Sequence, residues 1–378
     1  MGRFLLLTKE YSEAPTSGGS QRTLAIAETL SQYGDVVVVS PQGTLRRERG
    51  AVASVPPLPP AKLAQWRLAT AYRSISGARA GGTVLLTNLE RAMQQTYDLA
   101  VVDHTCLAGV ADLVGRHARR VVVSMHNVES TLMADRAKAA RGLKERLVMR
   151  AEARLLSRLE RVVAAHHYPT IVVSDADAAT LPNNPPPVVC RNGVFPSRIV
   201  MPERPLPPRA LIFTGALDWE PNAHGVEWFL LTTWPRIREQ FPDATLTIAG
   251  RNPSNRLLQY GRRLPGVTVV ADPPDMQPLL AAHGVGIVPL LEGGGSRLKI
   301  LEYLAAGLDV VSTAAGAAGL EDVPPELIDR APEGALLEVL ANRLRNPRDN
   351  RETATEWVRC TYTWDITMEP LAKLLVDA

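Results

Sequence analysis

The feature that most constrains the fold is an alternation of short apolar runs with helix-length amphipathic stretches. Apolar runs of roughly four to eight residues separated by helices are typical of a parallel sheet covered by helices on both faces. The alternation predicts an α/β protein. In the first half the expected strands are residues 3–8, 35–40, 99–103, 120–125, 170–174 and 188–191. In the second half they are residues 211–214, 245–249, 267–271, 285–289 and 309–312.

Proline marks the junction between the two series. Residues 185–208 hold eight prolines around the Asn192-Gly193 turn, and proline cannot donate a hydrogen bond within a central sheet. We therefore expect two Rossmann-like domains, over residues 1–190 and 208–350, with residues 357–378 packing back on the first. The 378 residues suffice for two domains. A cleft between them would face the carboxyl ends of the strands, where open α/β sheets bind ligands.

Composition excludes several classes of protein. The net charge of +3 is too small to indicate a nucleic-acid partner. Three cysteines, Cys106, Cys190 and Cys360, stand far apart without metal-ligand spacing, which favours reduced thiols and a cytoplasmic protein. The first apolar run is soon interrupted by Lys9 and Glu10, which predicts a strand rather than a signal peptide, and no run approaches membrane-spanning length.

A glycine-rich loop and the helix after it are the strongest functional signal. The loop is Gly-Gly-Gly-Ser at residues 293–296, and apolar periodicity predicts a helix from about residue 298 that stops at Gly307. Glycines let the backbone approach a ligand closely, and the free N–H groups of a helix start bind anions. Arg297 and Lys299 add two cations there, against the helix dipole unless an anion is bound. The stretch predicts a phosphate or diphosphate site. The alternative is a glycine-rich turn with solvated basic residues.

A basic helix is predicted within residues 136–161, which hold nine Lys or Arg and three Glu. One interpretation is a solvated face, with Glu145, Glu152 and Glu160 forming intrahelical ion pairs. The other is contact with a polyanionic acceptor or with anionic lipid, which would place the protein at the inner face of a membrane. The arginines recur every four residues and so form one stripe: Arg146, Arg150, Arg154 and Arg158.

The same motifs carry a family resemblance. Residues 293–302, followed by Ala-Ala-Gly at 305–307, resemble the nucleotide-sugar signature of retaining glycosyltransferases of family 4. These enzymes have the two-domain glycosyltransferase-B (GT-B) fold. The resemblance is to a subgroup with a Gly-Gly-Gly-Ser/Thr-Arg-Leu-Lys donor loop, and it extends over nearly the whole chain. Its other markers are residues 18–19, 124–130, 192–194, 213–215, 248–251 and 288–290.

The resemblance implies a donor site in the second domain. The loop backbone would hold the donor diphosphate, while Arg297 and Lys299 would neutralise the leaving group in place of a metal ion. Glu302 would bind the ribose hydroxyls. No metal or other cofactor is expected, and UDP is favoured slightly over GDP as the nucleotide of the co-substrate. The implied donor-binding residues are Gly18, Gly19, Gly215, Gly250, Arg251, Gly293, Gly294, Gly295, Ser296, Leu298 and Glu302.

The resemblance also implies a site in the first domain. His126 follows a predicted strand and would lie beside the transferred sugar as a catalytic residue with Arg297 and Lys299. Asn127 and Glu129 would position it or touch the acceptor. Asp103 and His104, at another strand end, are further candidates for the acceptor side.

Two departures from the family pattern bear on these roles. Gly294 stands eight residues before Glu302, where the family carries the first of two glutamates. Ala216 and Pro221 stand where the family usually has Arg and Lys after the first strand of the second domain. We infer that Arg297 and Lys299 supply the missing cations.

The sequence thus predicts a retaining, metal-independent glycosyltransferase that moves a sugar from a nucleoside-diphosphate sugar to a hydroxyl acceptor. The acceptor would be a cell-surface glycan, a glycolipid or a secondary metabolite. Two alternatives remain open: a catalytically silent nucleotide-sugar-binding protein, and a nucleotide-sugar epimerase of the same fold. A dinucleotide-dependent dehydrogenase is disfavoured, because no Gly-x-Gly-x-x-Gly follows the first strand.

Overall fold

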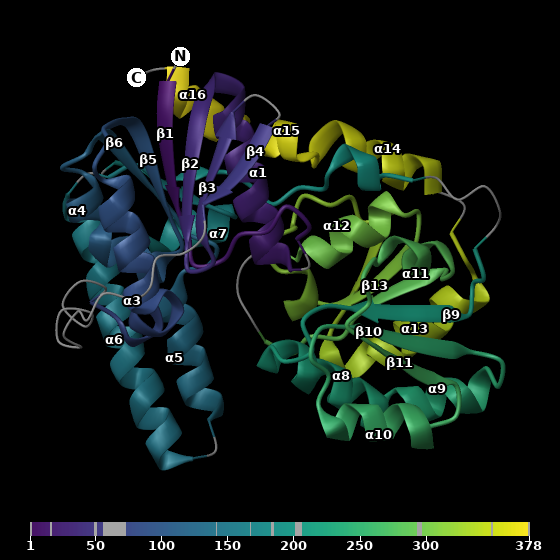
Figure 1. Cartoon of the computed structure of the whole chain (residues 1–378). Helices are drawn as coiled ribbons and strands as arrows, with labels where there is room; N and C mark the ends of the chain where they lie inside the picture. Colours follow the sequence, from purple (N-terminus) through teal and green to yellow (C-terminus); the bar gives the residue numbers. More distant parts are fainter. Residues whose placement is uncertain are drawn as a thin grey trace. The chain divides into compact units, whose positions relative to one another are not determined.

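The computed structural model describes residues 2–15, 17–48, 51–55, 73–140, 142–166, 168–182, 185–200, 206–292, 297–348 and 351–376. The chain forms two compact units (Figure 1). Unit 1 comprises Met1–Arg191 and Met368–Ala378, and unit 2 comprises Asn192–Thr367.

Unit 1 is built on an eight-stranded sheet with the order β4-β3-β2-β1-β5-β6-β7-β8. Six of its strands are parallel and correspond to the six predicted apolar runs: β1 (Gly2–Leu7), β2 (Gly34–Ser40), β5 (Tyr97–Asp103), β6 (Ala118–Ser124), β7 (Thr170–Val172) and β8 (Val188–Val189). Two antiparallel strands that the sequence analysis left unassigned extend the edge: β3 (Gly43–Glu48) and β4 (Ala51–Val55).

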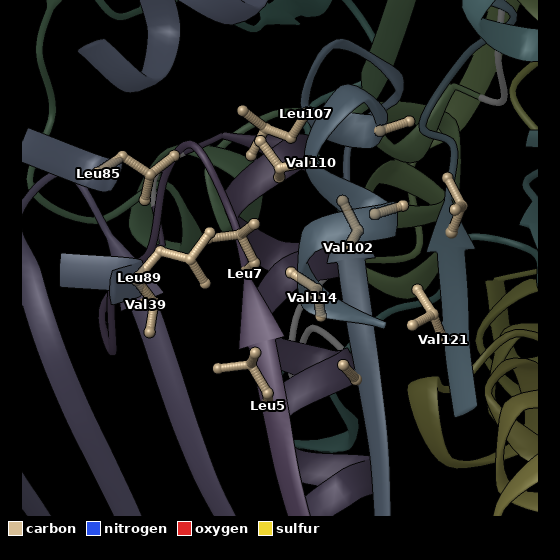
Figure 2. Close-up of a cluster of buried hydrophobic side chains, with 14 of the residues drawn as sticks. Leu5, Leu7, Val39, Leu85, Leu89, Val102, Leu107, Val110, Val114 and Val121 are labelled. Atoms are coloured by element: carbon tan, nitrogen blue, oxygen red, sulfur yellow. The ribbon is translucent and has the colours of Figure 1, made fainter. Parts of the chain in front are cut away.

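Helices cover this sheet and bury its apolar side chains. One cluster joins Leu5 and Leu7 of β1 to Leu85 and Leu89 of a helix and to Val102 of β5 (Figure 2). All five side chains are at most 1% exposed. Helices that cover a sheet in this way explain why its strands are continuous apolar runs. The helices of unit 1 are α1 (Gly18–Tyr33), α3 (Ile75–Ala92), η1 (Thr105–Val110), α4 (Ala111–Val114), α5 (Glu129–Ala139), α6 (Leu143–Ala165), α7 (Asp175–Thr180) and α16 (Glu369–Val376).

Unit 2 has a six-stranded parallel sheet with the order β11-β10-β9-β12-β13-β14. Five strands were predicted: β9 (Ala210–Thr214), β10 (Thr245–Gly250), β11 (Val267–Ala271), β12 (Val285–Val288) and β13 (Asp309–Thr313). The sixth, β14 (Ile328–Ala331), was missed because two of its four residues are charged. The helices are η2 (Pro196–Arg198), α8 (Glu220–Thr232), α9 (Trp234–Gln240), α10 (Asn255–Arg263), α11 (Gln277–Ala281), α12 (Leu298–Ala305), η3 (Ala315–Ala317), η4 (Glu333–Ala335), α13 (Leu336–Arg345), α14 (Arg351–Thr361) and α15 (Trp364–Thr367).

The segment that returns to unit 1 begins at Met368 rather than at residue 357. The α14 helix packs against α12 of unit 2, and the Tyr362 hydroxyl donates to Asp322 at 2.7 Å. Beyond that point, α16 packs against α1 and β8, and Arg120 donates to the carbonyl of Leu374 at 2.9 Å.

Each sheet has a topological switch point, where strands leave in opposite directions. In unit 1, β1 lies between β2 and β5, and in unit 2, β9 lies between β10 and β12. The carboxyl ends of strands at such a point open a crevice that commonly binds ligands. In both units the predicted site residues follow these strands.

The predicted basic helix is two helices, α5 and α6, packed against each other (Figure 1). Two of its glutamates do not form the expected intrahelical pairs. Glu152 instead accepts hydrogen bonds from the backbone N–H groups of Ile75 and Ser76 at the start of α3, and Glu160 accepts from Ser130 at the start of α5. Both carboxylates satisfy free N–H groups at a helix start and are buried. No helix in the described ranges is long and apolar enough to cross a bilayer.

Candidate functional site

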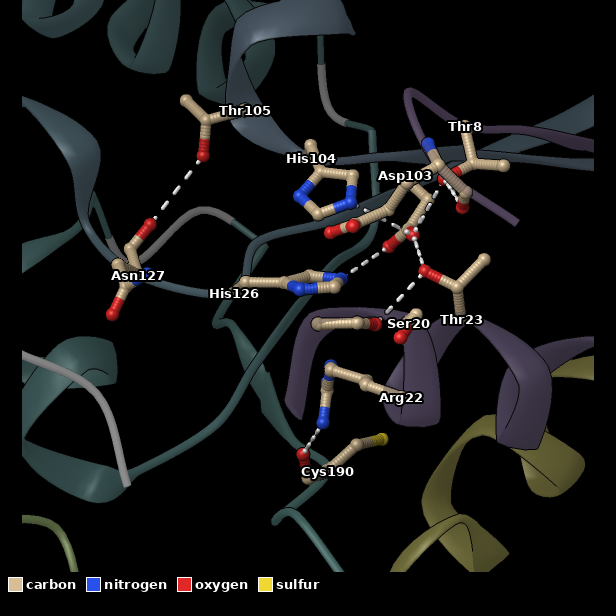
Figure 3. Close-up of polar contacts among 12 residues, drawn as sticks. Thr8, Ser20, Arg22, Thr23, Asp103, His104, Thr105, His126, Asn127 and Cys190 are labelled. Atoms are coloured by element: carbon tan, nitrogen blue, oxygen red, sulfur yellow. Dashed lines mark hydrogen bonds and ion pairs between the residues drawn. The ribbon is translucent and has the colours of Figure 1, made fainter. Parts of the chain in front are cut away.

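The site residues of unit 1 gather at the carboxyl ends of β1, β5 and β6. Asp103 ends β5 and pairs in register with Ser124, the last residue of β6. His126 follows two residues later, and its Nε2 lies 2.8 Å from Asp103 Oδ1 (Figure 3). The register of two parallel strands therefore builds an Asp–His pair from residues that are 23 positions apart.

Asp103 is fully buried and well supplied with hydrogen bonds. Thr23 of α1 donates to its Oδ2 at 2.7 Å, and Thr8 Oγ1 lies 3.3 Å from the same oxygen (Figure 3). Burial alone would raise the pKa of Asp103, but the neighbouring His126 and His104, together with hydrogen bonds, hold this pKa far below its usual range. The carboxyl group is therefore ionised at neutral pH.

The His104 ring packs against the ring of His126. His104 is 2% exposed, and the two ring centroids are 3.8 Å apart. Burial, and the positive charge of His126 whenever that ring is protonated, lower the pKa of His104 well below its usual value, so the imidazole of His104 is neutral. Its backbone has φ 78°, which a non-glycine residue rarely adopts. Asp103 and His104, the predicted candidates for the acceptor side, are thus both buried beside His126.

Gly18 and Gly19 form the amino end of α1, after an N-cap serine. Ser17 accepts a hydrogen bond from the backbone N–H of Ser20 in a capping box. A Cβ atom on Gly19 would lie 2.6 Å from Glu10 Oε1 and 3.6 Å from His126 Nδ1, so the start of α1 lies close to both side chains. The helix start therefore faces the free edge of the His126 ring.

The remaining residues near His126 are half-buried. Asn127 is one of them, and its carbonyl accepts from Thr105 Oγ1 at 3.4 Å. Glu129 is another, and it begins α5. Burial lowers the pKa of Lys9, but Cys106, Glu129 and Glu10 outweigh it, so the Lys9 pKa is raised and the ammonium stays charged. This edge of the unit 1 sheet therefore carries both positively and negatively charged side chains.

Asp103, His104 and His126 are the one group in the described part of the chain that brings three potential metal-ligand atoms within 4.8 Å of one another. The Asp103 carboxylate already accepts from Thr23 and is bonded to His126. The two imidazoles stack, with planes 36° apart, instead of directing their in-plane lone pairs at one point. The arrangement therefore suits a hydrogen-bonded cluster better than a cation.

Unit 2 places Lys299 at its switch point. The helix α12 spans Leu298–Ala305 and ends before Gly307, whose φ is 71°, as the periodicity predicted. Lys299 Nζ donates to Asn222 Oδ1 at 2.8 Å and lies 3.9 Å from the centre of the Phe213 ring at the end of β9. Burial first, and then the charge of Arg297, lower the pKa of Lys299 well below its usual value.

The loop after β9 is shaped to admit this lysine. Gly215 has φ 151°, and a Cβ atom there would lie 3.0 Å from Lys299 Nζ and 2.8 Å from Asn222 Nδ2. Asn222 also donates from Nδ2 to the carbonyl of Ala216 at 2.8 Å. Lys299 therefore reaches, from α12, the loop where the sequence lacks the family's own cations.

Arg297 is the second cation of this region. It is the N-cap residue of α12 and is 5% exposed, and its guanidinium lies 5.9 Å from the Trp219 ring centre. Leu298 beside it is also buried. The predicted loop residues Gly293, Gly294, Gly295 and Ser296 lie outside the described part of the chain.

Glu302 lies one turn further along α12 and pairs with Arg198 at 3.3 Å. Its side chain is 15% exposed. A ribose would therefore share this carboxylate with a guanidinium of the same unit. Sequence spacing could not identify Arg198, which is 104 residues away in the chain.

Gly250 and Arg251 end β10 beside β9. A Cβ atom on Gly250 would lie 1.7 Å from the carbonyl oxygen of Gly215, so this close approach of two strands requires glycine. Arg251 pairs with Asp218 at 3.4 Å and is exposed. The predicted donor-binding residues Gly215, Gly250 and Arg251 are thus neighbours at one edge of the sheet.

Comparison with known proteins matches this unit to one family. Residues 208–342 match the family described as "Glycosyl transferases group 1". An "Uncharacterized 44.6 kDa protein in cps region" of Klebsiella pneumoniae is 29% identical over 117 residues, which are 29% of this chain and 30% of that protein. The chain thus matches under a third of the length of this curated relative.

Solved structures extend the similarity to the whole fold. Sucrose-phosphate synthase from Thermosynechococcus elongatus superimposes with a TM-score of 0.73 at 14% identity, over 100% of this chain and 99% of that one. WaaG, a glycosyltransferase involved in lipopolysaccharide biosynthesis, gives 0.66 at 14% identity over 98% and 99%. The trehalose 6-phosphate synthase of Burkholderia multivorans gives 0.66 at 13% identity over 100% and 99%. With its two α/β units, the chain has the GT-B fold, as the sequence predicted.

Proposed function

We propose that this protein is a retaining, metal-independent glycosyltransferase that transfers a sugar from a nucleoside-diphosphate sugar to a hydroxyl acceptor. The observation that carries the proposal is a pair of neighbouring cations, the buried Arg297 and the half-buried Lys299, at the switch point of the unit that matches the group 1 family. Two cations this close together form a positively charged region, and a leaving diphosphate is an anion that such a region would stabilise. Retention is inferred from the family resemblance. Metal independence is inferred from this cation pair, which would take the place of a metal ion.

In this proposal unit 2 binds the donor. Arg297 and Lys299 stabilise the negative charge that grows on the leaving diphosphate, and Glu302 accepts from the ribose hydroxyls. His126 contributes from unit 1 beside the transferred sugar. As the donor bond breaks, the sugar becomes oxocarbenium-like, and the acceptor hydroxyl attacks from the same face.

The first experiment is a thermal-shift panel of UDP-, GDP-, TDP- and ADP-sugars, because a ligand that binds the folded state raises its melting temperature. Donors that stabilise the protein are then incubated with hydroxyl acceptors, and the anomeric configuration of the product is read by NMR. Transfer with retention supports the proposal. Stabilisation without turnover favours a silent nucleotide-sugar-binding protein, and a changed donor sugar without an acceptor favours an epimerase.

Peripheral contact with an anionic membrane surface is part of the same proposal. Arg150, Arg154 and Arg158 are exposed on α6, as are Leu143 and Leu147 at 72% and 56%. Arg146 is half-buried and donates to the carbonyl of Ala140. Because Glu152 and Glu160 are buried at the starts of other helices, the outer face of α6 is both cationic and apolar, as in helices that lie on anionic lipid.

Vesicle co-sedimentation tests this contact. The full chain should pellet with anionic vesicles but not with neutral ones, and salt should release it, since exposed charges are screened over about 10 Å at 0.1 M. Replacing Arg150, Arg154 and Arg158 with Gln should abolish pelleting. The matched control replaces three exposed arginines of unit 2, Arg236, Arg262 and Arg263. Equal pelleting of the two variants would contradict the contact.

A further inference from the structure

The hydrogen-bond pattern around His126 settles which of its nitrogens carries a proton. Asp103 is ionised, and an ionised carboxylate only accepts hydrogen bonds. The His126 Nε2 atom, 2.8 Å from Asp103 Oδ1, must therefore be the donor. The other nitrogen, Nδ1, lies toward Gly19 at the amino end of α1.

We propose that Asp103 is a positioning residue that holds His126 in the Nε2-protonated tautomer, so that Nδ1 is presented to a hydroxyl group of the bound sugar. The inference rests on the proposed function for the identity of the ligand, but the tautomer itself does not. In this proposal Asp103 does not touch the acceptor as the sequence suggested, but acts by orienting the His126 ring.

The surroundings explain why the pair is well defined. Thr23 donates to the second carboxylate oxygen, so Asp103 cannot rotate without losing a bond. The neutral His104 ring packs against one face of the His126 ring and adds no charge. A ring fixed on one edge and on one face presents its remaining nitrogen in a single direction, which lowers the cost of orienting a ligand.

Several charged groups face this cluster and bear on its pH response. They come from the loop after β1, from α1 and from the start of α5: Lys9, Glu10, Arg22 and Glu129. Of these, Glu10 lies nearest the open side, because its Oε1 atom would meet a Cβ atom on Gly19 at 2.6 Å. A ligand hydroxyl that approaches Nδ1 therefore enters beside Glu10.

The first test reads the tautomer without any activity. Histidine-selective ¹⁵N NMR of the full chain has only seven histidines to resolve, and His126→Gln assigns the signal. We expect a protonated Nε2 in the wild-type protein, and a changed or averaged state in Asp103→Asn. A protonated Nδ1 with an unprotonated Nε2 in the wild type would overturn the proposal. So would coordination of added Zn²⁺ by His104 and His126 at one equivalent, since that would make the cluster a metal site.

The second test reads the consequence for transfer. Asp103→Asn should lower kcat roughly 10²-fold, as expected for a misplaced catalytic group, while the KM for the donor changes much less. It should also shift the pH profile of kcat. The matched control is Asp98→Asn, the same substitution at the exposed amino end of the same strand. An Asp103→Asn enzyme with normal kcat and pH profile would overturn the positioning role. Absence of turnover in the wild type would instead count against the proposed function and leave the NMR test valid.

Discussion

The carboxyl edges of the two sheets hold similar positions in similar folds but handle buried charge in opposite ways. In unit 1 the buried carboxylate Asp103 is bonded to His126 and Thr23. In unit 2 the ammonium of the half-buried Lys299 donates to a neutral amide oxygen, and Arg297 lies nearby as a second cation. The proposed function uses this difference: it gives charge neutralisation to the cations of unit 2 and orientation of the sugar to the Asp103–His126 pair of unit 1.

The largest expected effect comes from removing the cations of unit 2. Lys299→Met keeps the apolar stem over Phe213, and Arg297→Ala removes the guanidinium near Trp219. Each should lower turnover by roughly 10²–10³, because each removes a group that stabilises charge in the transition state. Donor affinity should fall less than turnover.

Steady-state kinetics and donor titration measure both quantities. Arg262→Gln, an exposed arginine of the same unit, is the control and should leave them unchanged. Near-normal turnover in the double variant of Arg297 and Lys299 would show that these cations do not stabilise the leaving diphosphate.

An intermediate effect should follow when a carboxylate is introduced beside Lys299 in unit 2. Asn222→Asp places a carboxylate 2.8 Å from Lys299 Nζ and makes this edge resemble unit 1. The new charge should raise the pKa of Lys299 and repel a diphosphate, so nucleoside-diphosphate affinity should fall at least about tenfold. The control is Asn342→Asp on the exposed surface of α13. An unchanged affinity would place the diphosphate elsewhere.

A smaller effect should separate the two glycine sites. Gly215→Ala introduces a Cβ atom at φ 151° against Asn222 and Lys299, a conformation that costs a non-glycine residue about 1–3 kcal/mol. Gly19→Ala meets only the flexible end of Glu10, and alanine favours the helix. We expect Gly215→Ala to lower the melting temperature and Gly19→Ala to leave it within a few degrees. Equal melting temperatures would show that the loop after β9 is not constrained as described.

The smallest expected effect is the uptake of a fraction of a proton when a nucleoside diphosphate binds. Burial lowers the pKa of Lys299 in the free protein, and a diphosphate beside it would raise this pKa. The complex then holds more protons than the free protein, so affinity should fall as pH rises between the lowered and the raised pKa. Calorimetry in two buffers of different ionisation enthalpy should detect proton uptake, and Lys299→Met should abolish it. Proton release on binding to the wild-type protein would contradict the predicted rise in the pKa of Lys299.

Local patterns predicted much of this structure. Apolar runs gave eleven of the strands, and the periodicity before Gly307 gave α12. The antiparallel β3 and β4 lie in a proline-rich stretch without a clear alternation, and the charged edge strand β14 has a weak apolar pattern. These elements depend on pairing with a neighbour rather than on their own composition.

The site was predicted in part for a similar reason. Arg297, Lys299 and His126 were visible because a motif or a strand end marks them. Asn222 and the Asp103–His126 pair depend on contacts across 77 and 23 residues, which spacing does not encode. The roles of Glu152 and Glu160 were mistaken because a helical pattern shows the charge of a side chain but not the distant helix start that it caps.

The most direct test of the account is the metal dependence of nucleoside-diphosphate binding. UDP and GDP should be titrated calorimetrically into the full chain, once in EDTA and once in Mg²⁺ or Mn²⁺. If Arg297 and Lys299 offset the diphosphate charge, the preferred nucleotide should bind one site per chain with the same Kd in both conditions. Binding that appears only when a divalent cation is present would contradict the account.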